Sequence, residues 1–209
     1  GRDDRLSGSA MNGMKVAIIG SGTAGAATGI FLSRAGHEVT VFERVESPQA
    51  IGAGIMMQPS GMDVLRALGL LNKILTAGAR IDRLYAQTTS GRTVLDLPYE
   101  SYDANAYGLG LHRGILFRTL FDALCQSGAQ IHTGVEIVDL PVGAGGQSSL
   151  RDSHGNTFGP FDLVVVASGA RTSLREAVGI PHRNRPYRWG ALWFVADDPN
   201  SHFDGVLTQ

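Results

Sequence analysis

The feature that most constrains the fold is the stretch 14–44, in which closely spaced glycines separate two apolar runs. Lys15–Ile19 is short and rich in β-branched residues, which is typical of a strand buried on both faces. Three glycines follow with the spacing G-x-G-x-x-G, and residues 23–35 then predict a helix, with Gly36 suited to its C′ position. The alternating run 38–43 predicts a second strand. The stretch therefore predicts one β-α-β unit.

Each glycine of this fingerprint has a separate physical task. Gly20 lets the chain leave the first strand in a tight turn, Gly22 lets a diphosphate approach the backbone, and Gly25 allows close helix–strand packing. The helix N-terminus at Thr23 and Ala24 offers unpaired N–H groups and the positive end of the helix dipole, which both favour an anion. The fingerprint therefore favours dinucleotide binding over a glycine-rich turn that binds nothing.

An acidic residue ends the second predicted strand. Glu43 lies about 18 residues beyond Gly25, close to the spacing of about 20 that is typical of a ribose-binding carboxylate. Its two acceptor oxygens suit the two hydroxyls of an unphosphorylated ribose. Arg44 follows directly and could meet an adenylate phosphate or could be solvated.

Length, composition and charge exclude several classes of protein. The 209 residues suffice for one good core or for one and a half domains. The formal net charge of −1 leaves no basic surplus for phosphates, so we expect no nucleic-acid binding. No apolar stretch reaches about 18 residues, so we expect no membrane span. The single cysteine, Cys125, fits a reducing compartment, and we expect a cytoplasmic protein.

The remaining chain predicts further elements of an α/β domain. Residues 1–13 are small and polar and are interpreted as a tag or a flexible leader. A hairpin through Ser90-Gly91 interrupts the β-α-β order, so we expect a β segment inserted at about 81–110. The other predictions are a helix with Ser60 as its N-cap, helices at 70–77 and 113–126, a central buried strand at 162–167 and an aromatic strand at 187–196.

Other candidate sites each have two interpretations. Arg113 begins a predicted helix, where it could hold a phosphate bidentately or be an ordinary surface residue. Ser168 and Gly169 follow a buried strand, where open α/β sheets bind ligands, but could equally form a plain strand-to-helix turn. Gly54 lies in a glycine loop that could admit a flat ring or merely serve a turn.

No catalytic residue is assigned from the sequence. The six histidines give no i, i+4 pair, so we expect no metal site. No Ser/His/Asp arrangement can be argued from spacing, and no other acid–base set is evident. This pattern suits an enzyme whose cofactor performs the chemistry.

Four stretches together resemble the flavoprotein aromatic hydroxylases of the para-hydroxybenzoate hydroxylase type, which are single-component FAD-dependent monooxygenases. The stretches are residues 20–43, GAGIMMQPSGMDVLRALGL at 52–70, LHRGILFRTL at 111–120 and DLVVVASGARTSLR at 162–175. Many flavoproteins share the first stretch, but the four in this order are more specific. The resemblance covers most of residues 14–194.

The resemblance implies a Rossmann-like, three-layer α/β domain that binds FAD and NAD(P) over residues 14–180, with an inserted β-hairpin. Residues 181–209 would start the β-sheet of a truncated substrate domain. The implied activity is hydroxylation of a small aromatic substrate with NAD(P)H and O₂ through a flavin C4a-hydroperoxide. The alternatives are another FAD enzyme of this fold, such as a halogenase or a reductase, or a catalytically silent FAD- or nucleotide-binding fragment.

The resemblance also implies roles for individual residues. The ADP half of FAD would be held by Gly20, Gly22, Gly25, Glu43 and Arg44, with Thr23 and Ala24 at the helix start. Arg113 would contact the phosphate–ribityl region, Val135 would lie along the adenine, and the loop at Gly54 would face the isoalloxazine.

The chain departs from the family pattern at two places. Ser168-Gly169 stands where the family has an Asp-Gly fingerprint linked to FAD and NAD(P)H, so a shorter, neutral side chain replaces the acid. The family's later Gly-Asp motif does not occur before Gln209. We therefore interpret the chain as the N-terminal part of a longer protein, with a homodimer as one option for its assembly.

Overall fold

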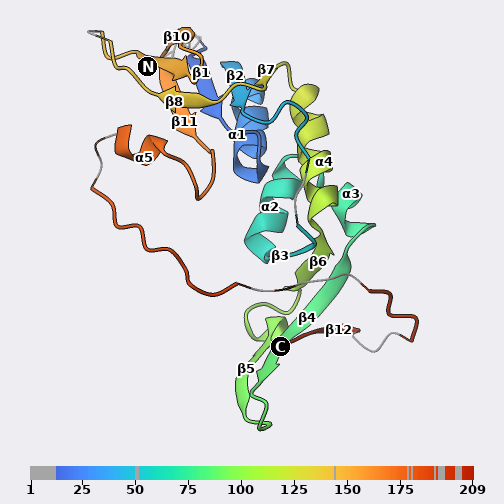
Figure 1. Ribbon diagram of the computed structural model, residues 1–209. Helices are drawn as coiled ribbons and strands as arrows, with labels where there is room; N and C mark the ends of the chain where they lie inside the picture. Colours follow the sequence, from blue (N-terminus) through green and yellow to red (C-terminus); the bar gives the residue numbers. More distant parts are fainter. Residues whose placement is uncertain are drawn as a thin grey trace, which may run out of the picture. The chain divides into compact units, whose positions relative to one another are not determined.

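A computed structural model describes residues 13–49, 52–143, 145–177, 179, 181–190, 192, 196–200 and 204–209. The chain forms two compact units, each made of two segments. The first comprises the described residues of Gly1–Glu46 and Cys125–Gly179, and the second those of Ser47–Leu124 and Ile180–Gln209. The second unit therefore contains a long segment that interrupts the first one in the sequence (Figure 1).

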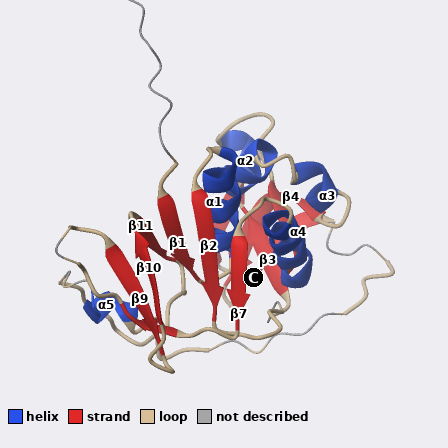
Figure 2. Cartoon of the chain, turned by 90° about the horizontal axis from the view of Figure 1, so that it is seen from above, coloured by secondary structure: helices blue, strands red, loops and turns tan. Residues whose placement is uncertain are grey.

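A parallel sheet organises the first unit. Its strands are β1 (Lys15–Ile19), β2 (Glu38–Glu43), β7 (Gln130–Thr133) and β11 (Leu163–Val166), in the order β11-β1-β2-β7 (Figure 2). All neighbouring pairs are parallel. Helix α1 (Thr23–Arg34) joins β1 to β2, which confirms the predicted β-α-β unit. Four of the five residues of β1 are buried, as expected for a strand covered on both faces.

Two further layers cover this sheet. Helix α1 packs against β1 and β2 and buries its small residues Gly25, Ala26 and Gly29 there. An antiparallel sheet in the order β10-β9-β8 is formed by β8 (Ile137–Asp139), β9 (Ser148–Asp152) and β10 (Thr157–Phe161). Ala17 and Ile19 alternate along β1 and pack in one core cluster with residues of this second sheet. The first unit therefore has the expected three-layer α/β architecture.

The core cluster of the first unit centres on an aromatic side chain from β2. Phe42 is almost fully buried, and its ring centroid lies 4.9 Å from that of Phe158 and 6.1 Å from that of Phe161. The buried members of the cluster are Ala17, Ile19, Phe42, Ile137, Leu150, Phe161 and Leu174. This packing joins β1 and β2 to the antiparallel sheet just below the ends of the parallel strands.

The second unit is built on a mixed sheet in the order β12-β4-β6-β3, with β5 paired to β4. Its strands are β3 (Gly54–Met57), β4 (Ala79–Gln87), β5 (Thr93–Pro98), β6 (Gly108–His112) and β12 (Gly205–Thr208). Its helices are α2 (Pro59–Ala67), α3 (Leu71–Leu75) and α4 (Arg113–Cys125), with a 3₁₀ turn at Tyr99–Ser101. The last residue of α4, Cys125, is assigned to the first unit. The predicted hairpin is confirmed, with Gly91 in the turn at φ 81°.

Four sequence predictions about elements are wrong; one is the loop predicted to contain Gly54, which is instead the first residue of β3. The strand at 162–167 was expected to be central, yet β11 pairs only with β1 in the described part of the chain, and Leu163 and Val166 are 39% and 38% exposed. An apolar run indicates a strand but does not identify its neighbours. The N-cap of α2 is Gln58, so Ser60 lies inside the helix, because Pro59 suits the first helical position.

The fourth error concerns the aromatic strand predicted at 187–196. Residues 187–190, 192 and 196 form no strand, and the other residues of this range lie outside the described part of the chain. Tyr187 and Trp189 are exposed. The late strand is instead β12, which runs parallel to β4. Aromatic content indicated β-propensity but could not supply a pairing partner.

Candidate functional site

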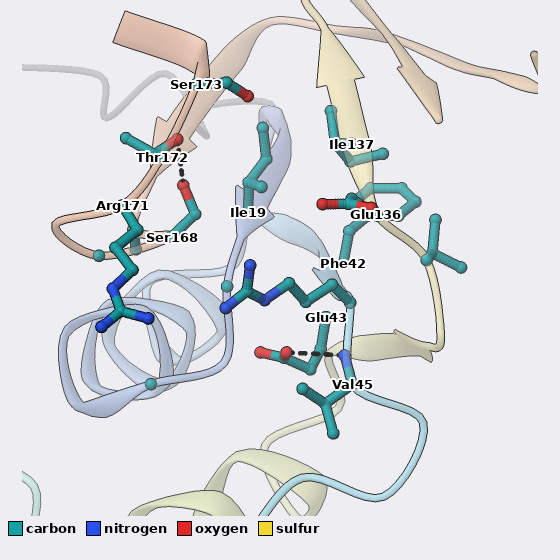
Figure 3. Close-up of a pocket in the computed structure, with 16 residues that line it drawn as sticks. Ile19, Phe42, Glu43, Val45, Glu136, Ile137, Ser168, Arg171, Thr172 and Ser173 are labelled. Carbon is teal, nitrogen blue, oxygen red and sulfur yellow. Dashed lines mark hydrogen bonds between the residues drawn. The ribbon is translucent and has the colours of Figure 1, made fainter. Parts of the chain in front are cut away.

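The carboxyl ends of the four parallel strands meet at one edge of the first unit. Ile19 pairs with both Phe42 and Val166, and Glu43 pairs with Thr133, so the strand ends are level. A cleft of about 290 Å³ lies directly beyond them (Figure 3). Open α/β sheets bind ligands at this position. Among the residues that line the cleft are the sequence-predicted Gly20, Gly22, Glu43, Arg44, Val135, Ser168 and Gly169.

The glycines of the fingerprint have very different surroundings. Gly20 has φ 102°, and a Cβ built on it would lie 2.7 Å from the carbonyl oxygen of Ala167. A Cβ on Gly25 would lie 1.9 Å from the carbonyl oxygen of Gly20. A Cβ on Gly22 would meet no atom within 4 Å. Two glycines therefore permit close packing of the turn, whereas Gly22 leaves open space above the backbone.

The N-terminus of α1 follows Gly22 directly. No side chain caps the helix at Gly22, and the first helical bond runs from the Ala26 N–H to the Gly22 carbonyl at 2.8 Å. The amides of Thr23, Ala24 and Gly25 precede that bond, so they lack partners within the helix. Thr23 and Ala24 are also exposed. The turn therefore offers convergent N–H donors to an anion.

The carboxylate of Glu43 is held by three donors. Its Oε2 atom accepts hydrogen bonds from the backbone N–H and the hydroxyl of Ser21, both at 2.9 Å. Its Oε1 atom accepts one from the backbone N–H of Val45 at 3.0 Å (Figure 3). Glu43 lines the cleft, so this fixed carboxylate belongs to its wall. Sequence reasoning missed Ser21, for which the only signal was a hydroxyl residue between two fingerprint glycines.

An apolar wall lies beside Glu43. The backbone N–H of Val135 donates to the carbonyl oxygen of Glu43 at 2.9 Å, and the N–H of Gly134 donates to that of Val45 at 3.3 Å. The segment after β7 therefore runs alongside the end of β2. Val135 is half-buried and packs against the core cluster, which fixes its place in the cleft wall. This position suits the flat, apolar face of an adenine ring.

The turn after β11 closes the other side of the cleft. The hydroxyl of Ser168 donates to Oγ1 of Thr172 at 2.8 Å (Figure 3). Thr172 Oγ1 also accepts from the N–H of Leu174 at 3.2 Å. These bonds connect the turn to α5 (Leu174–Ala177). Ser168 therefore has a structural partner while it also lines the cleft. Arg171, which sequence reasoning did not select, lines the same side.

The remaining predicted residues belong to the second unit. Gly54 begins β3, where it pairs with His112 of β6, and Arg113 follows at the start of α4. The N–H of Arg113 donates to the carbonyl of Ala53 at 2.9 Å. A Cβ on Gly52, which has φ 120°, would lie 3.1 Å from Cδ and Nη1 of Arg113. Gly54 and Arg113 are thus close neighbours within their own unit.

The residues of the cleft fit the ADP half of FAD. The space above Gly22 suits a diphosphate, the amides of α1 would donate to it, and the fixed Glu43 carboxylate suits a ribose hydroxyl.

Among the described residues, no group of three or more His, Cys, Asp and Glu side chains is placed to hold a metal ion. None of the helices in the described ranges is both long and apolar enough to cross a membrane.

Comparison with known proteins gives a consistent result. The FAD binding domain family matches residues 13–206. The 6-hydroxynicotinate 3-monooxygenase of Pseudomonas fluorescens is 32% identical over 166 residues, covering 78% of this chain and 42% of that protein. The 3-amino-4-hydroxybenzoate 2-monooxygenase of Streptomyces cremeus is 28% identical over 169 residues, covering 79% and 42%.

Solved structures share the fold. The tetrameric form of 2-methyl-3-hydroxypyridine-5-carboxylic acid oxygenase superimposes with a TM-score of 0.70 at 24% identity, covering 81% of this chain and 43% of that one. This chain spans less than half the length of these relatives. The chain therefore belongs to the FAD binding domain family and is related to the para-hydroxybenzoate hydroxylase-like, FAD-dependent monooxygenases.

Proposed function

We propose that this chain holds FAD for a monooxygenase that hydroxylates a small aromatic substrate with NAD(P)H and O₂. The observation that carries the proposal is the convergence of the strand ends on one cleft, where Gly22 is open, the α1 amides are exposed and Glu43 is fixed. Membership of the FAD binding domain family supports the cofactor. The relatives named above act, by their names, on hydroxylated aromatic acids, which supports the substrate class.

Each residue selected from the sequence has a proposed role. The amides of Thr23 and Ala24 would bind the diphosphate, with Gly20, Gly22 and Gly25 shaping the turn. Glu43 would accept from the ribose, Val135 would cover the adenine, and Arg44 would neutralise phosphate charge. Ser168 and Gly169 would border the diphosphate from the β11 side. In the second unit, Gly54 and Arg113 would meet the isoalloxazine and the phosphate–ribityl region.

FAD, when bound, supplies the redox chemistry by taking reducing equivalents from NAD(P)H and by activating O₂. The described residues would orient the adenine half through one carboxylate and a row of amides. No described side chain is assigned a proton-transfer role. The single cysteine supports a reducing, cytoplasmic setting. We retain residues 14–180 as the proposed FAD-binding domain and 181–209 as the proposed start of the substrate domain.

The proposal is tested by cofactor content and by substrate response. The purified chain is expected to retain FAD, seen as flavin absorbance that remains after gel filtration. The product of the complete reading frame is expected to oxidise NAD(P)H faster when a phenolic acid is added. A chain that carries no flavin and takes none up would contradict the proposal. Retained flavin without stimulated oxidation would instead favour a silent binding module.

A further inference from the structure

Among the described residues of the fingerprint region, Ser21 is the one whose side chain hydrogen-bonds to the carboxylate of Glu43. It is 1% exposed. Its backbone N–H and its hydroxyl both donate to Oε2 of Glu43 at 2.9 Å. A carboxylate can only accept, so the hydroxyl proton of Ser21 must point toward Glu43. The two donors of Ser21 fix the position of Oε2, and the N–H of Val45 on Oε1 fixes the rotation of the carboxylate.

The bonds to Glu43 leave few acceptor positions for a ligand. A carboxylate has about four lone-pair positions, two on each oxygen. The two bonds from Ser21 occupy Oε2, and the N–H of Val45 occupies one position on Oε1 at 3.0 Å. One position, on Oε1, remains. This replaces the sequence-based expectation that both oxygens of Glu43 are available to two ribose hydroxyls.

We infer that Ser21 is a positioning residue that makes Glu43 read a single ribose hydroxyl through Oε1. The inference rests on the proposed function, since it requires an adenosine diphosphate group in the cleft. The hydroxyl of Ser21 holds the carboxylate through a charge-assisted bond, which is stronger than a neutral one. Without that hydroxyl, Oε2 gains an open acceptor position, while the backbone N–H groups of residue 21 and Val45 still hold one oxygen each.

The test compares three ligands by isothermal titration calorimetry on the purified chain: ADP, 2′-deoxy-ADP and 3′-deoxy-ADP. In the wild-type chain, one deoxy analogue is expected to bind roughly tenfold more weakly than ADP, because it loses a hydrogen bond to a charged group, while the other binds about as well as ADP. In Ser21→Ala, the ratio of the dissociation constants of the two deoxy analogues is expected to fall to roughly twofold, because the open position on Oε2 adds a second acceptor for a ribose hydroxyl.

Matched variants separate positioning from a general effect on folding. Ser33→Ala removes a hydroxyl from α1, within the same unit but outside the cleft lining, and is expected to keep the wild-type discrimination. Ser21→Cys keeps the side-chain size but supplies only a weak donor, so it is expected to behave like Ser21→Ala and replaces it if the alanine variant does not fold.

Several outcomes would overturn the inference. One is that the ratio of the dissociation constants of the two deoxy analogues is the same in both Ser21 variants as in the wild type, even if all three ligands bind more weakly. Another is an equal loss of affinity for both deoxy analogues in the wild-type chain, which would mean that Glu43 reads two hydroxyls. A wild-type chain that binds neither FAD nor ADP would overturn the proposed function itself, and the inference with it.

Discussion

At the scale of single residues, Gly22 and Gly25 serve different purposes although both belong to the same fingerprint. A Cβ on Gly25 would lie 1.9 Å from the carbonyl oxygen of Gly20, a distance that requires the backbone to move. A Cβ on Gly22 would meet no atom within 4 Å, and the φ of Gly22 is −63°, which alanine adopts readily. Packing of the chain therefore requires Gly25, whereas no described neighbour requires a glycine at position 22, which supports the proposal that a ligand approaches the backbone there.

Alanine substitutions at these two positions are expected to affect different properties, stability at Gly25 and FAD binding at Gly22. Gly25→Ala should lower the free energy of unfolding by about 3 kcal/mol, because overpacking displaces the turn from the helix. Gly22→Ala should change it by less than about 1 kcal/mol but should weaken FAD binding, because the methyl group occupies the approach to the backbone. Urea unfolding and FAD titration measure the two effects. Tight FAD binding by Gly22→Ala would contradict this assignment.

The role of Glu43 is tested by a substitution that removes its charge. Glu43→Gln places an NH₂ group opposite the donors of Ser21 or Val45, so we expect a loss of about 1–3 kcal/mol in the free energy of unfolding. FAD binding should weaken as well, because a ribose acceptor is lost. Glu136→Gln is the matched control, since Glu136 also lines the cleft and the charge change is the same. Equal effects of the two substitutions would argue against a specific contact by Glu43.

At the scale of elements, local patterns and long-range pairings were not equally predictable. The elements β1, α1 and β2 follow from hydrophobic period and glycine spacing, which are properties of neighbouring residues. The edge position of β11 and the strands β3 and β12 depend on pairing with distant segments. A sequence pattern contains no information about such partners. The loop predicted near Gly54 is therefore a strand, and the described residues around Trp189 form none.

The starts of β1 and β11 are joined by a carboxylate whose effect should depend on pH. Asp162 Oδ2 accepts from the N–H of Lys15 at 2.8 Å, and Oδ1 accepts from the side-chain amide of Gln147 at 2.7 Å. The backbone bond from Lys15, followed by the bond from Gln147, holds the pKa of Asp162 below its usual value. The pKa in the folded state is therefore lower than in the unfolded state, so the stabilisation is present above about pH 4 and is lost as the carboxyl protonates.

We therefore expect Asp162→Asn to unfold at lower urea concentration than the wild-type chain at pH 7. The difference should shrink as the pH falls below about 4 and disappear once Asp162 is protonated in the wild type. Asp122→Asn, an exposed change on α4, serves as the control. A difference for Asp162→Asn that stays constant from pH 7 to pH 3 would show that its charge does not matter.

At the scale of the whole molecule, the predicted residues fall into two groups. Those around the strand ends share one cleft of the first unit, while Gly54 and Arg113 are neighbours in the second unit. Seven of the residues selected from the sequence line the cleft, because they lie at or just after the ends of strands. The sequence did not predict Ser21 or Arg171, because their selection requires knowing which side chain the half-buried Glu43 carboxylate meets and which turn borders the cleft. The domain boundary at residue 180 stays a prediction.

Ligand binding to the first unit should stabilise the folded chain. A ligand that binds only the folded state at about 100 times its dissociation constant raises the free energy of unfolding by about 2.7 kcal/mol. FAD is expected to raise the thermal midpoint of the chain accordingly, and ADP should do so in proportion to its own affinity. Riboflavin, which lacks the diphosphate and adenosine, is the control. A larger shift with riboflavin than with ADP would place recognition away from the cleft.

The most direct test of the account is a titration of the purified chain with FAD, followed by flavin fluorescence, in the absence and presence of ADP. The account predicts saturable binding at one site, competition by ADP and weaker binding in both Gly22→Ala and Glu43→Gln. FAD binding that ADP does not reduce and that neither substitution weakens would contradict the claim that the turn after β1 and the end of β2 receive the adenine half of the cofactor.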